Sequence, residues 1–213
     1  MKKRTFFTVL VLLGSILVAG AQKMLVEGIV EYKITVVNAN DVPGVADAFV
    51  GAAQTLQVKG YKSRTDFRSS LRNQVTVYDA QTGNGFVLRQ MGNDKFLIML
   101  DSKTWKLYHK RFDGTTYTIG QEQKTIAGYT TTKAVGKMPD GSEITVYFAP
   151  DLGLMAKGYD LAFANLPGLP LEYELKSGGV VLRYEATEVK QTMVNSSSFD
   201  MPKSGYKVLE YKQ

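Results

Sequence analysis

Most of the chain alternates between apolar and polar residues with a period of two. Between residues 30 and 36 the even positions hold Val, Tyr, Ile and Val, whereas the odd positions hold Glu, Lys and Thr. The same alternation returns in residues 143–148, 171–176 and 182–187. Because one apolar and one polar face are typical of antiparallel strands covered on a single side, the pattern predicts an antiparallel sheet. Residues 96–100 are apolar throughout, which predicts a central strand of the sheet covered on both faces.

Dipeptides that favour tight turns separate these stretches. They are Asn84-Gly85, Asp113-Gly114, Asp140-Gly141 and Gly178-Gly179. Such pairs supply the positive φ angles that two-residue hairpin loops require. Repeated at short intervals, and with no spacing typical of βαβ units, they predict a meander of about ten strands.

Two segments depart from this alternation. In residues 42–53 the apolar positions are 42, 45, 46, 49, 50 and 53, which is the spacing of one helix face. Asn40, Asp41 and Pro43 are residues that suit the start of a helix. Together they predict an amphipathic helix of about three turns. Residues 150–170 combine eight large apolar residues with three glycines and three prolines. This composition predicts a short helical turn and a loop that fold over the sheet.

The expected fold is therefore mainly β: a large curved antiparallel sheet, or half-barrel, with a helix and a loop covering its concave face. Such a concavity is larger than these two segments can fill, so either the protein's own side chains or a ligand must occupy it. The candidate ligand-binding residues are Phe49 and Val50 of the helix, Trp105 of the sheet, and Leu161, Phe163 and Leu166 of the loop.

The first 21 residues have the features of a cleaved signal peptide. A basic start, Lys2-Lys3-Arg4, precedes an apolar run of 13 residues, which is shorter than the roughly 20 residues a membrane-spanning helix needs. The run ends in Ala19-Gly20-Ala21, so we expect cleavage after Ala21. The mature protein would be a single domain of residues 22–213 in the periplasm or the medium, with no stable membrane span.

Composition excludes several classes of function. The chain has no Cys and one His, which removes thiol nucleophiles, disulfides and multi-His metal sites within one chain. Without the three basic residues of the signal the formal net charge falls from +6 to +3, and the remaining charges are interspersed. No basic run can follow a phosphate backbone, so we expect no nucleic-acid partner. We also expect no cofactor.

Catalytic groups are sparse in the sequence. His109 is expected on a strand beside Trp105, and no G-x-S-x-G turn supplies a nucleophile for it. Glu172 and Glu174 share the polar face of one predicted strand. A solvated pair explains them, although a hydrolase with an unrecognised carboxylate pair stays open. We expect a protein that is not an enzyme.

Several short pieces of the chain, in their order, resemble a known family. They are residues 27–32 (EGIVEY), 60–64 (GYKSR), 126–129 (IAGY), 165–173 (NLPGLPLEY) and 199–202 (FDMP). They resemble exported bacterial proteins of unknown function typified by a Gly-Leu-Pro-Gly-Leu-Ile stretch, which are distantly similar to the periplasmic lipoprotein carriers (LolA/LolB-like). Asn165 and Pro170 stand where that stretch has Gly and Ile.

The resemblance implies an open half-barrel whose helices cover a hydrophobic cavity for acyl chains. In the carriers an arginine on an early strand holds this cover closed, and Arg64 is the matching position here. The carriers have a helix before the first strand, whereas this chain begins with a strand.

Together these features favour a non-enzymatic cell-envelope protein that binds a hydrophobic ligand, a lipid or the acyl chain of a lipoprotein, in the concavity. The alternative is a structural or interaction protein of the envelope with a filled core. It would bind an envelope protein partner at its convex face or at an exposed strand edge.

Overall fold

The computed structural model describes residues 22–39, 46–177 and 179–211. Twelve strands form one sheet in the order β14-β7-β6-β5-β4-β3-β2-β13-β12-β10-β9-β8, which does not close on itself. Neighbours in this sheet are antiparallel except β14 and β7, which are parallel. A second, small sheet pairs β1 with β11 in parallel. The predicted open antiparallel sheet is confirmed.

Strands make up most of the described chain. In chain order they are β1 (Lys23–Leu25), β2 (Glu27–Ala39), β3 (Ala53–Lys59), β4 (Lys62–Arg68), β5 (Asn73–Asp79), β6 (Asn84–Met91), β7 (Asp94–Leu100), β8 (Thr116–Ile126), β9 (Tyr129–Lys137), β10 (Glu143–Ala149), β11 (Leu152–Leu154), β12 (Leu169–Ser177), β13 (Val180–Lys190) and β14 (Lys207–Glu210). The helical segments are α1 (Ser102–Tyr108) and three 3₁₀ turns, η1 (Asp47–Phe49), η2 (Leu161–Phe163) and η3 (Ser196–Phe199).

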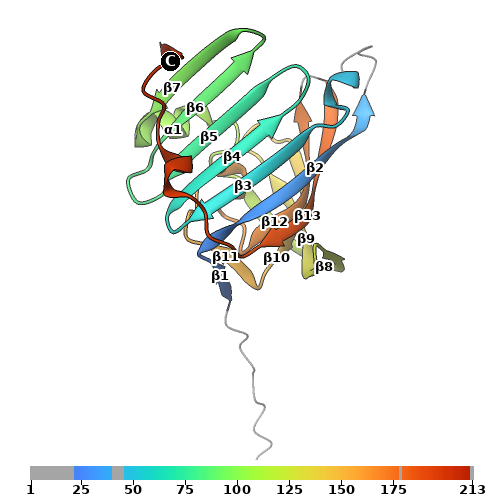
Figure 1. Ribbon diagram of the computed structural model, residues 1–213. Helices are drawn as coiled ribbons and strands as arrows, with labels where there is room; N and C mark the ends of the chain where they lie inside the picture. The colour runs from blue at the N-terminus through green and yellow to red at the C-terminus, as the bar shows by residue number, and fades with distance from the viewer. Residues whose placement is uncertain (1–21, 40–45, 178, 212–213) are drawn as a thin grey trace, which may run out of the picture.

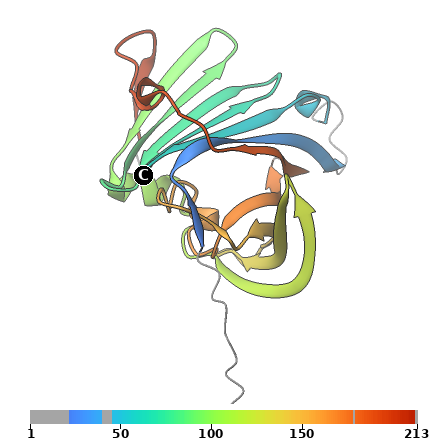
Figure 2. The same ribbon diagram turned by 60° about the horizontal axis from the view of Figure 1, so that its bottom comes forward.

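The large sheet is strongly curved, and each of its faces has its own cover. Strands β8–β10 and β12 curl round beneath the broad part formed by β2–β7 (Figure 2). The concave face carries α1 and the segment with β11 and η2. The opposite, convex face carries residues 191–206, which we call the C-terminal strap and which cross the near side of the sheet in Figure 1.

The core lies mainly on the concave side. Leu56, Ile144 and Leu169 are almost fully buried there, in one large cluster of side chains from the sheet and from the segment with β11 and η2. A second cluster packs α1 on the sheet through Trp105, Val87 and Ile98. A third lies on the convex face, where Leu97 packs with side chains of the strap. Strand β7 is thus covered on its concave face and, at Leu97, on its convex face, but it lies beside the edge strand β14 instead of at the predicted central position, and Met99 is 51% exposed.

The predicted helix over residues 42–53 is wrong in the part that the structure describes. Only η1 forms there, and Ala53 already pairs with Lys33 and Arg68 in the sheet. Residues 42–45 lie outside the described residues. The helical spacing is real, but pairing with two neighbouring strands outweighs a weak local preference.

The helix that does form, α1, lies where the sequence predicted a strand. Asp101 caps it, because its carboxylate accepts hydrogen bonds from the backbone N–H groups of Lys103 and Thr104. The helix turns Trp105 onto the concave face, where the side chain is 1% exposed. Trp105 therefore belongs to the helix and His109 is its C-terminal cap, so neither residue lies in a strand.

The apolar segment over residues 150–170 folds over the sheet as predicted. It contains the helical turn η2, whose residues are all buried, and in addition the short strand β11, which the sequence did not predict. Within the described part of the chain, no helix is both long and apolar enough to span a bilayer.

Candidate functional site

The six predicted ligand-binding residues do not surround one cavity. Trp105 and Leu161 belong to the cluster beneath α1, whereas Phe163 and Leu166 belong to the main core cluster. Phe49 packs half-buried against that core, and Val50 is 78% exposed. The described side chains of the protein itself therefore occupy the space that the sequence assigned to a ligand.

Trp105 shows how closely the concave side is packed. Its indole stacks on the ring of Tyr78 at 4.4 Å between centroids, and its Nε1–H donates to the carbonyl oxygen of Gly158 at 3.1 Å. Beneath it, Gly85 leaves no room for a side chain, because a Cβ there would come within 2.7 Å of the indole ring. These contacts give Trp105 a packing role.

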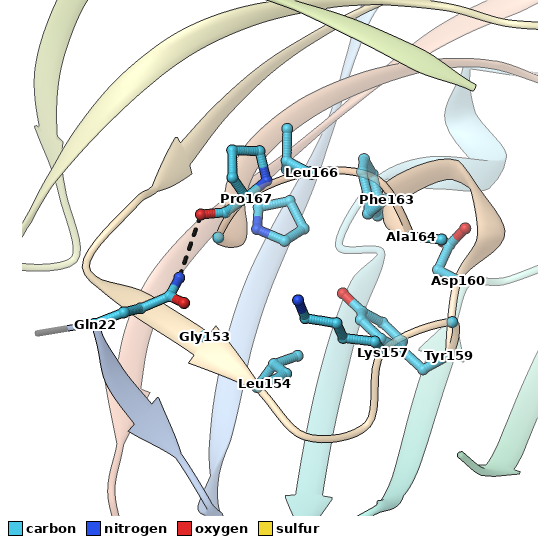
Figure 3. Close-up of a pocket in the computed structure, with 13 residues that line it drawn as sticks. Gln22, Gly153, Leu154, Lys157, Tyr159, Asp160, Phe163, Ala164, Leu166 and Pro167 are labelled. Atoms are coloured by element: carbon cyan, nitrogen blue, oxygen red, sulfur yellow. Dashed lines mark hydrogen bonds between the residues drawn. The ribbon is translucent and has the colours of Figure 1, made fainter. Parts of the chain in front are cut away.

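A small cavity does lie beside Phe163 and Leu166, between η2 and the start of β11 (Figure 3). Its volume is about 30 Å³, which is the space of about one water molecule. Gln22 closes one side, since its Nε2–H₂ group donates to the carbonyl oxygens of Pro150 and Pro167 at 2.9 and 3.2 Å. A ligand of lipid size does not fit here.

Arg64 contacts a covering segment, but on the other face of the sheet from the one expected. Its Nε and Nη2 donate to the two carboxylate oxygens of Asp66 at 2.7 and 2.8 Å. Its Nη1 donates to the carbonyl oxygen of Ser198, at 2.8 Å, in the C-terminal strap. Arg64 therefore holds the strap on the convex face, away from the segment with β11 and η2.

A second polar contact fixes the strap at Val194. The backbone N–H of Val194 donates to Oε1 of Glu27 at 2.7 Å, and Lys59 donates to the carbonyl oxygen of Val194 at 2.9 Å. Lys59 and Glu27 also pair with each other at 2.7 Å. The hydrogen bond from Lys59, followed by that from Val194, lowers the pKa of the Glu27 carboxyl.

The end of the strap borders an open apolar groove of about 650 Å³. Phe86 and Met99, paired on the neighbouring strands β6 and β7, share the convex face there. Met201 of the strap and Leu209 of β14 also line the groove, and about half of the Met99 and Met201 surfaces is exposed. A second hollow of about 300 Å³ shares Phe86 and Met201 with it.

This groove was not predicted from the sequence. Met201 and Leu209 lie in a stretch without periodic apolar spacing, and only their pairing with distant strands brings them beside Phe86. The one available signal was the presence of flexible, polarizable methionines, which adapt to hydrophobic ligands of variable shape.

The groups considered for catalysis have structural partners. Glu172 pairs with Lys124 at 2.8 Å, and Glu174 pairs with Arg183 at 2.6 Å. His109 caps α1, and its Nδ1 lies 3.0 Å from the carbonyl oxygen of Trp105. Burial lowers the pKa of His109, while the nearby Asp160 opposes that shift.

No known family model matches the sequence, and no curated protein matches it significantly. Among solved structures, PNGF-II is similar with a TM-score of 0.50 and 16% identity over 87% of this chain and 31% of that one. A beta-barrel-like protein of a domain of unknown function (DUF1849) from Brucella abortus has a TM-score of 0.43 and 11% identity over 78% of this chain and 98% of that one. MucB has a TM-score of 0.30 and 13% identity, with 83% of this chain and 57% of MucB covered.

This chain thus spans about a third of PNGF-II and over half of MucB. At 16% identity the likeness to PNGF-II is one of fold, and it gives this chain no activity, substrate or partner.

Proposed function

We propose that the protein is a non-enzymatic binding protein of the cell envelope that holds a hydrophobic ligand, a lipid or the acyl chain of a lipoprotein. The observation that carries this proposal is the apolar groove of about 650 Å³ between β6, β7, β14 and the end of the strap. Its volume lies within the roughly 300–1,000 Å³ of ligand pockets. The envelope location rests on the signal-like composition of residues 1–21.

Burial of methylene groups would supply the affinity. Each buried methylene contributes about 0.8 kcal/mol, so a chain of about sixteen gives roughly 13 kcal/mol before costs. Association itself costs roughly 4–15 kcal/mol, which this gross energy can exceed without any charged contact. The exposed sulfurs of Met99 and Met201 can adjust to chains of different length.

In this proposal the C-terminal strap is the movable wall of the site. Phe199 anchors the strap in the cluster with Val77 and Phe86, and Met201 follows two residues later at the groove. The hydrogen bond from Arg64 to Ser198 sets the position of this anchor. Arg64 thus acts on a cover, as the resemblance implied, but on the convex face of the sheet.

The test is lipid analysis of protein purified from the envelope of its native cells. We expect mass spectrometry of an organic extract to show a lipid above background, and Met99→Gln combined with Met201→Gln to reduce it several-fold. Met91→Gln is the matched control, because Met91 is equally exposed on β6 and does not line the groove. A lipid-free extract, or equal retention in the control and the double variant, would contradict the proposal.

The alternative of an interaction protein with a filled core keeps one observation in its favour. Apart from a polar recess of about 150 Å³, the protein's own described side chains fill the predicted concave hollow, and β8 is an edge strand with nearly all its residues exposed. Such an edge can pair with a strand of another protein. Lipid-free protein from the native envelope would favour this alternative.

A further inference from the structure

A polar recess of about 150 Å³ lies on the concave face, on the opposite side of the sheet from the apolar groove. Its sheet side consists of glutamine, threonine and aromatic side chains of β3, β4, β5 and β13. His109, Tyr159 and Asp160 close it from the covering segments, and Arg72 lines it from the turn between β4 and β5. The volume equals that of about five water molecules, so only a small ligand fits.

Asp160 lacks a cationic partner within this recess. Its Oδ1 accepts a hydrogen bond from the backbone N–H of Ala162 at 2.9 Å, and no ion pair joins its carboxylate to another described residue. Burial raises the pKa of Asp160 and lowers that of His109, and the electrostatic interaction between these two side chains opposes both shifts. A partly buried carboxylate without an ion pair is costly, so a cation in the recess would be favourable.

Arg72, an exposed residue, presents the opposite charge to the recess without an anionic partner. Its guanidinium lies over the ring of Phe67, 5.1 Å from the centroid, and its side chain has no ion pair or hydrogen bond to any other described residue. Arg72 and Asp160 both act on the hydroxyl of Tyr184: burial raises the pKa of Tyr184 to about 12, Arg72 lowers it and Asp160 raises it. The two charges thus lie near one hydroxyl without contacting each other.

The neighbouring amides are held in fixed orientations by the protein. Nε2 of Gln54 donates to the hydroxyl of Tyr173 at 2.8 Å, so its carbonyl oxygen stays available as an acceptor. Oε1 of Gln74 accepts a hydrogen bond from Arg89 at 3.3 Å. A site with fixed polar groups and two separated, unpaired charges is organised for a ligand that carries both charges.

We infer that this recess binds a small zwitterion, a free α-amino acid, whose ammonium group faces Asp160 and whose carboxylate faces Arg72. The guanidinium fork suits a carboxylate, and the ammonium supplies the charge that Asp160 lacks. The rings of Phe67, Tyr159 and Tyr184 would enclose the carbon skeleton. A neutral sugar would satisfy the amides and hydroxyls but would leave both charges unpaired.

The test is isothermal titration calorimetry on exhaustively dialysed protein with each of the twenty free amino acids and with neutral monosaccharides. We expect saturable binding of at least one small amino acid and none of the sugars. The amide and the N-acetyl derivative of that amino acid, which each lack one charge, should bind at least tenfold more weakly. Absence of binding by any amino acid, or equal binding of the blocked derivatives, would overturn the inference.

Variants locate the binding. Asp160→Asn retains an acceptor for Ala162 but removes the charge, and Arg72→Gln removes the guanidinium; each should weaken binding at least tenfold. Arg68→Gln is the matched control, since Arg68 is an exposed arginine of β4 that does not line the recess. If Arg68→Gln weakens binding as much as the folded Arg72→Gln does, the assigned recess is wrong. Met99→Gln should leave amino-acid binding unchanged, so this inference and the proposed lipid site fail separately.

Discussion

Gly85 on β6 allows the close contact between this strand and Trp105 of α1, because glycine has no side chain. A Cβ at this position would lie 2.7 Å from the ring of Trp105 and 2.5 Å from the carbonyl oxygen of Val77. Neither neighbour can move without shifting α1 or the β5–β6 pairing. The sequence places Gly85 in a turn dipeptide, and its role against Trp105 becomes visible only when β6 and α1 are in contact.

We predict that Gly85→Ala destabilises the protein. Crowding of this kind costs about 1–3 kcal/mol in the free energy of unfolding, which urea denaturation would measure. Gly120→Ala is the control, because the nearest atom to its added Cβ is the Lys133 carbonyl oxygen at 3.3 Å. Equal destabilisation of both variants would show that Trp105 is not tightly held.

Arg64 is the second residue with a sharp expectation. Arg64→Met leaves the buried carboxylate of Asp66 without its partner and removes the hydrogen bond to Ser198. Hydrogen bonds to charged groups contribute about 1.5–3 kcal/mol, so we expect a loss of roughly 2 kcal/mol in denaturant unfolding. Arg68→Met, which replaces an exposed arginine of the same strand, should change the stability by less than about 0.5 kcal/mol. A similar loss in Arg68→Met would argue against a specific role of Arg64.

Among the elements, strands and the cover over residues 150–170 were predictable, whereas α1 and the strap were not. Alternation with a period of two identified β2, β12 and β13, in which buried residues alternate with more accessible ones, and β10, in which this alternation holds only for the first half. The helix was misplaced because residues 46–53 have helical spacing, whereas only the short turn η1 forms there and Ala53 already pairs in the sheet. The cap at Asp101 was a readable local signal for α1. The strap gave none, because only Val194 and Phe199 are buried in it.

The candidate binding residues were also predictable only in part. The sequence assigned Phe163 and Leu166 to a ligand pocket, and it could not show that both residues pack in the core cluster of the protein itself. Arg64 was expected to contact a cover of the concave cavity, whereas in the structure it donates a hydrogen bond to Ser198 of the strap on the convex face. The groove and the polar recess each depend on residues more than one hundred positions apart, which only the fold brings together.

The contact of the strap with Glu27 predicts a pH-dependent element. The pKa of Glu27 is lowered below its ordinary value of 4.5, so the stabilisation is present above that value and is lost as the pH falls through the lower, folded-state pKa. Hydrogen exchange should show the Val194 amide losing protection in this acidic window, after correction for the intrinsic rate, while Ile98 in β7 stays protected. Glu27→Gln should abolish this pH dependence. Protection of Val194 that does not vary with pH would contradict the assignment.

At the scale of the whole molecule, a single sheet separates two different environments. On β6, Phe86 faces the convex groove and the adjacent Val87 faces the core beneath α1. One layer of backbone therefore divides the apolar groove from the packed core beneath α1. The sheet is open, with β14 and β8 at its two edges, so its solubility depends on how these edges are protected.

We predict that removal of residues 207–213 promotes self-association. Strand β14 pairs in parallel with β7, and its loss would expose the backbone of β7 together with the apolar Met99. Light scattering after size-exclusion chromatography should show larger species for the shortened chain than for the full chain at equal concentration. A shortened chain with the same mass profile as the full one would show that β14 does not protect this edge.

Trp105 is the one tryptophan of the chain, and its ring centroid lies 4.3 Å from that of His109, which lines the polar recess. The protein therefore carries a built-in optical reporter at that site. Its fluorescence should respond to occupancy of the recess and to the ionisation of His109, and should report unfolding when the indole reaches solvent. A ligand titration followed by Trp105 emission could then measure occupancy of the recess without an added label.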